Sequence, residues 1–337
     1  MSIPKEILTA HTATTRGREE SDYYSIKVDD EGKVATKTTG LVAQNATVHK
    51  DAKDMSMHSK FENQSPLEFR NSHFMTISGQ GRLGNKMFEF ASLLGIAYRH
   101  NYTPYILQRH PLHNTFEIPK ENIRSLPKLD NVISIGEGAA GKYFVKTENL
   151  THDKNYTLGG YYQSWKYFDF VSDLVRKSFK FKSQHERKAK IAIETYARGN
   201  RPSVGVHVRR SDMASTRELR RGYNVAPKSY FQKAFEFFRK NLTDPVFLII
   251  SDDLRWSKAN LQAEDVSFVS TGDPGADLAI LASCNHSIVS TGSFGWWGGY
   301  LSGGTVVYFS NFPARDSWLA GQYDKKDYYP PRWIAME

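Results

Sequence analysis

Short apolar segments alternate with helical ones through the second half of this chain, and this alternation is the feature that most limits its fold. The apolar segments are rich in Val, Ile and Phe, as β-strands are. Strands separated by helices predict an α/β fold with parallel sheets and helices on both faces. The expected strands are Ser203–Val208, Val246–Ile250, Val266–Val269, Ser287–Ser290 and, as the last strand, Thr305–Phe309, and the expected helices are Ser229–Lys240, Leu254–Leu261 and Asp277–Cys284.

The first half begins with the same unit. Phe74–Ile77 is a short apolar run, Ser78–Asn85 is a glycine-rich turn, and apolar residues then follow at helical spacing up to Ala97. A basic segment, Lys182–Arg201, reads as a helix leading into a linker, so we place a domain boundary near residue 200. Residues 1–72 are polar and lack sustained periodicity, which predicts a disordered tail or stalk.

The charge of the chain favours an anionic ligand. Its 337 residues include 45 Lys and Arg against 36 Asp and Glu, a net charge of +9, which suits a nucleotide, a nucleic acid or a lipid head group. No compact run of basic residues interleaves with aromatic ones, so a dedicated nucleic-acid surface is the weaker interpretation. A small phosphorylated ligand is favoured.

Two features bear on the cellular compartment. The single cysteine, Cys284, excludes an intrachain disulfide and by itself suggests a reducing environment. Seven of the sixteen asparagines nevertheless stand in Asn-x-Ser/Thr sites, where chance gives about two. Some of these sites can be turn chemistry alone, but the excess predicts exposure to the glycosylation machinery. The seven are Asn45, Asn63, Asn101, Asn149, Asn155, Asn241 and Asn285.

The sequence contains no segment with the features of a membrane span or of a signal peptide. No run of about 18 apolar residues occurs, and the first twenty residues lack the basic cap and apolar core of a secretory signal. If the protein resides in a secretory compartment, we expect its anchor to be missing from this sequence.

Polar and glycine-rich loops follow the expected strands. Arg209 and Arg210 end the first strand of the second half, where a guanidinium can fork onto a phosphate; the alternative is a surface pair held by Asp212. Ser251–Asp253 follows the next strand, and one of its aspartates is expected to cap a helix. Ser290–Gly299 follows another strand, with small residues that let backbone N–H groups approach a phosphate and with Phe294, Trp296 and Trp297 as pocket walls or core.

These segments together resemble a known family. VGVHVRRSD, SDD, CNHSIVSTGSFGWWGGYLSGG, GQGRLGNKMFEFASLLGIA and the aromatic segment GGYYQSWKYF are similar to the galactoside α-1,2-fucosyltransferases of glycosyltransferase family 11, and more loosely to the wider α-1,2, α-1,6 and protein O-fucosyltransferase group. The resemblance covers roughly residues 73–315. One departure is Ser211, where the family usually has Gly or Thr; a small hydroxyl leaves the turn intact.

The resemblance implies an architecture and a reaction. The architecture is GT-B-like, with two Rossmann-like domains facing across a cleft: residues 73–200 on the acceptor side and residues 201–337 binding GDP-fucose. The reaction is inverting transfer of L-fucose to the 2-hydroxyl of a terminal β-galactoside without a metal. Animal relatives resemble type II membrane proteins of the Golgi lumen, and the oligomeric state is left open. The sequence agrees on the metal, because it contains no Asp-x-Asp to clamp a divalent ion.

The resemblance also suggests roles for single residues. Arg209 is expected to hold the β-phosphate of GDP, and Asp212 is expected to orient Arg209 or His207 rather than to touch the substrate. Arg210 is expected to pack inward because neighbouring strand residues point to opposite faces. Three residues remain open as the catalytic base: Glu218, His113 and Asp212. The expected donor-binding residues are Arg82, Gly84, Asn85, His207, Arg209, Arg210, Asp252, Asp277, Ser293 and Phe294, and the expected acceptor-binding residues are Trp165 and Trp297.

Three other functions compete with this one. A fucosyltransferase acting on another glycan or on a protein keeps the same donor residues. A non-catalytic protein that binds GDP or a glycan is a second possibility, and the intact Arg209 and Asn85 argue against it. A nucleic-acid binder is the third, motivated only by the net charge.

Overall fold

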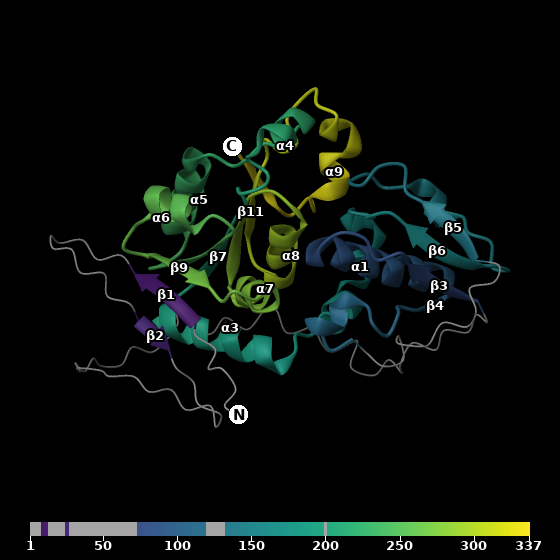
Figure 1. Ribbon diagram of the computed structural model, residues 1–337, viewed down its shortest axis with the longest axis horizontal. Helices are drawn as coiled ribbons and strands as arrows, with labels where there is room; N and C mark the ends of the chain where they lie inside the picture. Colours follow the sequence, from purple (N-terminus) through teal and green to yellow (C-terminus); the bar gives the residue numbers. More distant parts are fainter. Residues whose placement is uncertain (1–7, 13–23, 27–72, 119–131, 199–200) are drawn as a thin grey trace.

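The structure is a computed structural model that describes residues 8–12, 24–26, 73–118, 132–198 and 201–337 (Figure 1). Its helices and strands form two lobes, each built on its own sheet. The expected α/β class is therefore confirmed. Among the described residues, no helix combines the length and the apolar character needed to cross a bilayer.

The first lobe is a four-stranded parallel sheet with the strand order β4-β3-β6-β5. Strand β3 occupies Phe74–Ile77, as predicted, and is buried along its whole length. Helix α1, Leu83–His100, follows the glycine-rich turn and ends at Asn101, which adopts a left-handed conformation with φ 58°. The other elements are β4 (Thr103–Pro104), β5 (Val132–Gly136), β6 (Asn155–Gly159), α2 (Ser172–Ser178) and the 3-10 turns Pro111–Asn114, Val145–Glu148, Trp165–Tyr167 and Asp169–Val171.

The second lobe contains six parallel strands in the order β12-β11-β10-β7-β8-β9. Counted along the chain from β7, this is the 3-2-1-4-5-6 order of a Rossmann sheet. The expected strands and helices are present within a few residues of their predicted ends. The elements are β7 (Ser203–Val208), α4 (Thr216–Arg221), α5 (Lys228–Asn241), β8 (Val246–Ser251), α6 (Leu254–Leu261), β9 (Val266–Ser270), α7 (Pro274–Ser283), β10 (His286–Val289), α8 (Ser293–Ser302), β11 (Val306–Phe309), the 3-10 turn Leu319–Gln322, α9 (Lys325–Tyr328) and β12 (Ile334–Met336).

The end of the chain corrects one expectation. Thr305–Phe309 was expected to be the last strand, but β12 lies beyond it and pairs in parallel with β11. The three residues of β12 are too short a run to stand out in the sequence. The sheet is thus one strand wider at this edge than predicted.

Side chains of strand β8 alternate between two apolar layers. Phe247 and Ile249 belong to the core shared with α5 and α6, whereas Leu248 and Ile250 pack on the opposite face with residues of α7 and of helix α3 (Ser183–Tyr196). Neighbouring side chains of a strand point to opposite faces, and helices cover both faces of β8. This is why the run Val246–Ile250 contains no polar residue. Both faces of the second sheet are therefore closed to water.

Helix α3, Ser183–Tyr196, lies against the second sheet rather than the first. Its Ala189, Ala192 and Tyr196 share a core with α7 and β8. The division of the chain at residue 200 stays a prediction, but this basic helix packs with the second lobe.

Two strands lie within the segment expected to be a tail. β1, Leu8–Thr12, pairs antiparallel with β9, and β2, Tyr24–Ile26, pairs antiparallel with β1. Both are at the left of Figure 1, at the edge of the second sheet. The rest of residues 1–72 lies outside the described residues, so the tail stays a prediction there.

The two lobes meet through helices α1 and α8, which lie next to each other in Figure 1. The junction is aromatic: Phe88 of α1 has its ring centroid 4.5 Å from that of Trp296 and 5.1 Å from that of Trp297. Phe168 stacks on Trp297 at 5.5 Å. All four side chains have at most 1% of their surface exposed. The lobes are therefore joined by one continuous core.

Candidate functional site

The strand order of the second sheet marks one position as the natural ligand site. Strands β7 and β10 are neighbours, but the chain leaves them toward opposite edges of the sheet. In such sheets the loops after these two strands separate and leave a crevice at their carboxyl ends. Arg209 follows β7 there, and Ser290–Gly292 follows β10. Two of the predicted strand-end loops are thus side by side.

The starts of two helices meet at this crevice. An added Cβ on Gly84, at the start of α1, would lie 2.7 Å from the backbone nitrogen of Phe294 at the start of α8. The indole Nε1 of Trp297 donates to the carbonyl of Gly84 at 3.0 Å. Neither helix has a side-chain cap on its first turn. Uncapped helix starts carry free N–H groups and partial positive charge, so the position between them is electrostatically suited to an anion.

Arg209 is held between two carboxylates at the same edge. Its Nη2 lies 2.6 Å from an oxygen of Asp212, and its Nε lies 3.2 Å from Asp252. Its own backbone N–H donates to Ser290 Oγ at 3.0 Å. Only 22% of the Arg209 side chain is exposed. The guanidinium is therefore oriented before any ligand arrives.

Arg82 approaches from the first lobe. Its Nη1 lies 3.7 Å from Asp212, and 81% of its side chain is exposed. Asp212 thus faces one arginine from each lobe, as the expectation of a site between the lobes requires. An anion at this point can draw both guanidinium groups away from the shared carboxylate.

His207 lies under the site rather than in it. The ring is buried, and burial, followed by the nearby Arg209 cation, lowers the pKa of His207 to about 4. Its Nδ1 is 3.3 Å from Ser290 Oγ, and an added Cβ on Gly295 would overlap the ring at 2.2 Å. The first turn of α8 covers the ring, so this geometry does not favour the expected direct donor contact by His207, and the neutral ring lies beside Ser290.

Arg210 points away from the crevice. Its guanidinium lies 3.8 Å from the ring centroid of Trp256 and donates to the carbonyl of Ala226 at 3.0 Å. This is the inward packing that strand alternation predicts, and donor binding by Arg210 stays a prediction that this contact does not favour. Asp252 accepts the backbone N–H of Arg210 at 2.8 Å, and the family departure Ser211 donates its hydroxyl to the Asp252 carbonyl at 2.9 Å.

The two neighbouring aspartates after β8 have different tasks. Asp253 is the N-cap of α6, with Oδ1 accepting the N–H of Trp256 at 2.9 Å. This leaves Asp252 to face Arg209. The prediction that one of the pair is a cap is confirmed.

Asn85, Ser293 and Phe294 lie where the lobes touch. Ser293 Oγ donates to Asn85 Oδ1 at 2.5 Å, so the serine hydroxyl proton is used within the protein. The backbone N–H groups of Ser293 and Phe294 are then the groups of this pair that are suited to an anion. The ring centroid of Phe294 lies 5.7 Å from that of His207.

Trp165 and Trp297, the two residues expected to bind the acceptor, differ in how deeply they are buried. Trp297 has none of its surface exposed, so no ring face is open for a sugar and its acceptor role is excluded. Trp296 is equally buried, so neither tryptophan is a pocket wall. Trp165 is half-buried, and its Nε1 donates to the carbonyl of Lys326 at 3.0 Å. Trp165 therefore stays a candidate for the acceptor side.

Two of the candidate catalytic bases, Glu218 and His113, contact other groups of the protein. Glu218 pairs with Arg221 at 3.1 Å and with Arg217 at 3.7 Å, and its backbone N–H is capped by Ser215 Oγ. His113 is 3.2 Å from the Leu107 carbonyl through Nε2.

Asp277 stands in the first turn of α7, at the carboxyl edge of the same sheet. Its Oδ1 accepts from Thr271 Oγ1 at 2.7 Å and from the Thr271 backbone N–H at 3.1 Å. Burial raises its pKa above the usual range of an aspartate. This half-buried carboxylate has room for a further hydrogen bond through its second oxygen.

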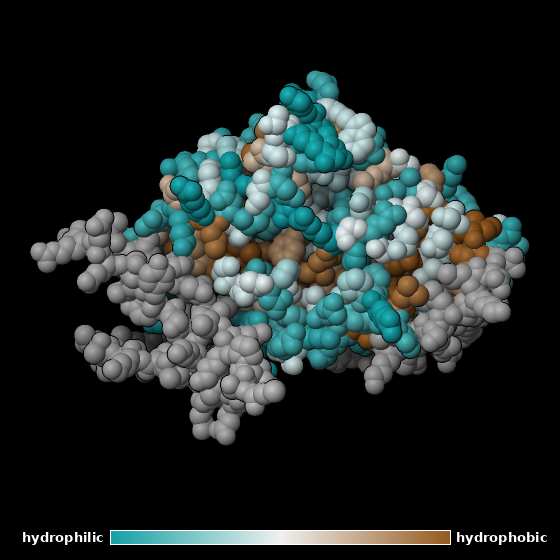
Figure 2. Space-filling view, in the orientation of Figure 1, coloured by the Kyte–Doolittle hydropathy of each residue, from teal (hydrophilic) through white to brown (hydrophobic). Residues whose placement is uncertain are grey.

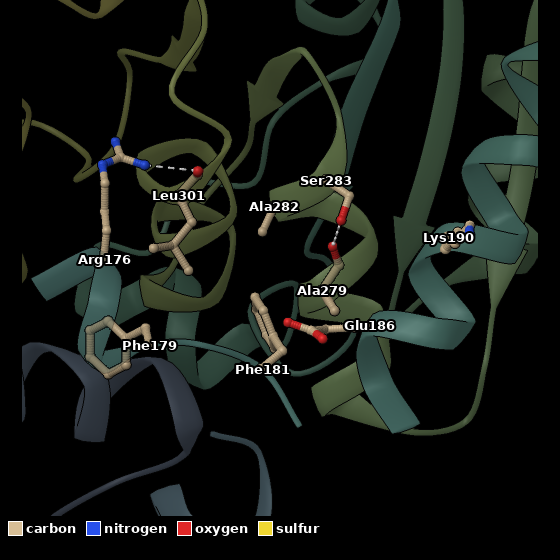
Figure 3. Close-up of a pocket in the computed structure, with 9 residues that line it drawn as sticks. All are labelled: Arg176, Phe179, Phe181, Glu186, Lys190, Ala279, Ala282, Ser283 and Leu301. Carbon is tan, nitrogen blue, oxygen red and sulfur yellow. Dashed lines mark hydrogen bonds between the residues drawn. The ribbon is translucent and has the colours of Figure 1, made fainter. Parts of the chain in front are cut away.

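A separate cavity of about 290 Å³ lies at the opposite edge of the second sheet (Figure 3). Its lining comes from helices α2 and α3, from the loop between them, and from the C-terminal halves of α7 and α8. It is therefore remote from the helix starts that form the crevice. Among the residues coloured in Figure 2, hydrophilic ones are the most common, and hydrophobic ones are visible across the middle of this face. Among the described residues, no group of three His, Cys, Asp or Glu side chains is arranged to hold a metal ion.

The glycosylation sites that can be placed are mostly at the surface. Asn101, Asn149, Asn241 and Asn285 are exposed. Asn155 is half-buried, and its Oδ1 accepts the backbone N–H of Phe74 at 3.0 Å. Asn45 and Asn63 lie outside the described residues.

Sequence reasoning missed two polar residues close to the site. Glu89 is fully buried on α1, and both of its oxygens accept the backbone N–H of Gln80 in the glycine-rich turn, at 2.8 and 3.1 Å. Gln163 is 4% exposed and donates to Asn85 Oδ1 at 2.9 Å. The sequence could have indicated Glu89, because a carboxylate between Phe88 and Phe90 is unusual on an apolar helix face. An amide inside an aromatic segment was a weaker signal for the second.

Comparisons with known proteins found a matching family model and similar sequences. The model of Glycosyl transferase family 11 matches residues 45–337. Galactoside alpha-(1,2)-fucosyltransferase 1 of Rattus norvegicus is 32% identical over 277 residues, covering 77% of this chain and 72% of the relative, and the Homo sapiens protein of the same name is 29% identical over 273 residues, with 77% and 74% covered.

One solved structure shares the fold. The structure of an Arabidopsis thaliana FUT1 mutant in complex with GDP superimposes with a TM-score of 0.50 and 12% identity, covering 75% of this chain and 73% of the other. At this identity the similarity concerns the fold alone. The expected GT-B-like architecture is confirmed by it together with the two sheets.

Proposed function

The chain belongs to glycosyl transferase family 11 and is a glycosyltransferase, and we propose that it transfers L-fucose from GDP-β-L-fucose to the 2-hydroxyl of a terminal β-galactoside. The product carries an α-1,2 linkage, and the anomeric carbon is inverted. The names of the curated relatives support this donor and acceptor class. The proposal requires no metal and no cofactor besides the co-substrate GDP-fucose.

The single observation that carries the donor proposal is the place of Arg209. It lies at the crevice of a Rossmann sheet, beside the uncapped starts of α1 and α8, and within reach of the exposed Arg82. The β-phosphate of GDP binds at this point, with backbone N–H groups of Ser293 and Phe294 as further donors. Asp277, at the same edge of the sheet, accepts hydrogen bonds from guanine.

The reaction follows from these positions. The bond between the anomeric carbon of fucose and the β-phosphate oxygen breaks, and its electron pair stays on the phosphate, where Arg209 offsets the growing negative charge. The acceptor oxygen attacks the opposite face of the sugar, forms the new bond to the anomeric carbon and releases its proton to solvent water. Asp212 keeps Arg209 oriented throughout. Because the fucosyl centre is oxocarbenium-like, proton loss comes late and demands little of a base.

We also propose that the protein acts in the lumen of the Golgi apparatus as a type II membrane protein. The exposed asparagines at 101, 149, 241 and 285 support a location with access to glycosylation. A galactose-terminated glycan is the expected partner, and no nucleic acid is required.

The test is GDP release from GDP-fucose in the presence of EDTA, with and without lactose or N-acetyllactosamine. We expect release that depends on the acceptor and persists in EDTA. In Arg209→Ala, kcat should fall by roughly a hundredfold to a thousandfold, the usual cost of one lost transition-state donor. The control is Arg239→Ala, which removes a surface pair with Asp265 and should keep wild-type turnover. Bound GDP without turnover on any galactoside would refute the proposed acceptor.

A further inference from the structure

Four side chains form a hydrogen-bonded chain across the lobe junction. The Tyr323 hydroxyl donates to Gln163 Oε1 at 2.7 Å. Gln163 Nε2 donates to Asn85 Oδ1 at 2.9 Å, and Ser293 Oγ donates to the same oxygen at 2.5 Å. Tyr323 follows the 3-10 turn Leu319–Gln322, and Gln163 lies in the aromatic segment after β6. Asn85 is at the start of α1 and Ser293 at the start of α8.

Gln163 has little freedom to do anything else. Its side chain is 4% exposed, and its backbone N–H donates to the Ala140 carbonyl at 2.8 Å. A buried amide must satisfy both its oxygen and its nitrogen within the protein. Tyr323 supplies the donor for the oxygen, so the nitrogen is left to donate to Asn85. In this arrangement the hydrogen bonds run from Tyr323 through Gln163 to Asn85.

This direction determines how Asn85 is turned. Both incoming donors meet Oδ1, so the Nδ2 group points the other way, toward the glycine-rich turn. An added Cβ on Gly81 would lie 2.3 Å from Asn85 Nδ2. Gly81 immediately precedes Arg82, the cap residue of α1. The Asn85 amide thus presents its N–H groups, and not its oxygen, to the turn that carries Arg82.

We propose that Gln163 is a positioning residue of the donor site: it fixes the amide of Asn85 so that Nδ2 donates on the side of the diphosphate. This inference rests on the proposed function, because it takes the anion at the junction of α1 and α8 to be the diphosphate of GDP-fucose. Gln163 itself touches no substrate. Its effect passes through Asn85, and Tyr323 holds Gln163 in turn.

The decisive variant is Gln163→Glu, which preserves shape and removes the donor. A carboxylate at this position accepts from Tyr323 but has no N–H for Asn85 Oδ1. The Asn85 amide then turns over to donate to the new carboxylate, and its oxygen faces the phosphates. We expect KM for GDP-fucose to rise at least tenfold, with KM for N-acetyllactosamine within twofold of wild type. If the hydrogen bonds instead run in the opposite direction, with Asn85 Nδ2 donating to Gln163 Oε1, Gln163→Glu should leave KM for GDP-fucose unchanged.

A double-mutant cycle separates positioning from stability. In an Asn85→Ala background the oriented amide is gone, so Gln163→Glu should change KM for GDP-fucose by less than twofold. Tyr323→Phe, which removes only a hydroxyl, serves if Gln163→Glu does not fold, and it should show a smaller rise with the same dependence on Asn85. Wild-type KM in Gln163→Glu, or an equal rise in both backgrounds, would overturn the proposal.

GDP binding distinguishes this proposal from the function on which it rests. If the wild type transfers no fucose to a galactoside but binds GDP in a titration calorimeter, the same cycle is run on Kd for GDP. At least tenfold weaker binding in Gln163→Glu, absent in the Asn85→Ala background, would support the positioning role even though the proposed acceptor had failed. A wild type that neither transfers fucose nor binds GDP would overturn both.

Discussion

Glu89 offers a prediction whose size can be worked out from the structure. This carboxylate is fully buried beneath the glycine-rich turn and accepts the Gln80 backbone N–H with both oxygens. Burial raises the pKa of Glu89 from 4.5 to about 7; hydrogen bonds from the turn and the Lys86 cation oppose the rise, and the Glu137 carboxylate adds to it. Lys86 in turn holds the carbonyls of Gly79 and Gly81 through its ammonium group.

The raised pKa of Glu89 sets the sign of the pH dependence. Between pH 4.5 and 7 the folded protein binds a proton here that the unfolded chain does not, so the free energy of unfolding falls as pH rises through this window. At 1.36 kcal/mol per pH unit, the rise in pKa corresponds to about 3 kcal/mol. This stability is present at pH 4.5 and lost above pH 7.

Glu89→Gln removes the titration and keeps the shape of the side chain. We expect the free energy of unfolding of the variant, relative to wild type, to rise by about 2.5 kcal/mol between pH 5 and pH 8, the part of the total that falls within this range. Urea denaturation followed by tryptophan fluorescence at pH 5, 6, 7 and 8 and constant ionic strength measures it.

The control is Ser92→Ala, a buried and non-titrating residue on the same helix whose hydroxyl donates to the Tyr162 carbonyl at 3.0 Å. It should lose about 1 kcal/mol equally at every pH. If the difference between Glu89→Gln and wild type is also flat from pH 5 to pH 8, the buried environment does not perturb Glu89 and the reasoning is wrong.

Three further outcomes follow from single contacts. Gly84→Ala places a Cβ 2.7 Å from the backbone of Phe294, so Kd for GDP should rise about tenfold as the helix starts separate, whereas Gly138→Ala, with nothing within 4 Å, should bind GDP like wild type. Tyr230→Phe removes a buried hydroxyl that donates at 2.8 Å and should cost about 1 kcal/mol in urea denaturation with unchanged GDP release. Asn241→Gln, expressed in a secretory host, should lose one glycan by mass spectrometry, because Asn241 is exposed.

The local sequence pattern predicted the bounds of an element correctly where that element has its own uninterrupted signal along the chain. β7 and α6 have the predicted bounds because an uninterrupted apolar run and a capped helix carry their own signals. β4, with two residues, and β12, with three, have no such signal, since they exist only by pairing with β3 and β11. Trp297 misled the sequence reading because an aromatic residue in a loop motif suits a sugar site and a core equally well.

The sequence by itself determined the strand and helix alternation, the cation at the end of β7 and the family, because each is written in neighbouring residues. Only the tertiary structure decided that Arg209 faces the crevice while Arg210 packs on Trp256. It alone brought Asn85 within 2.5 Å of Ser293, 208 positions away in the chain. Such contacts depend on how two lobes pack, and packing is a property of shapes and buried surfaces that no short stretch of sequence encodes.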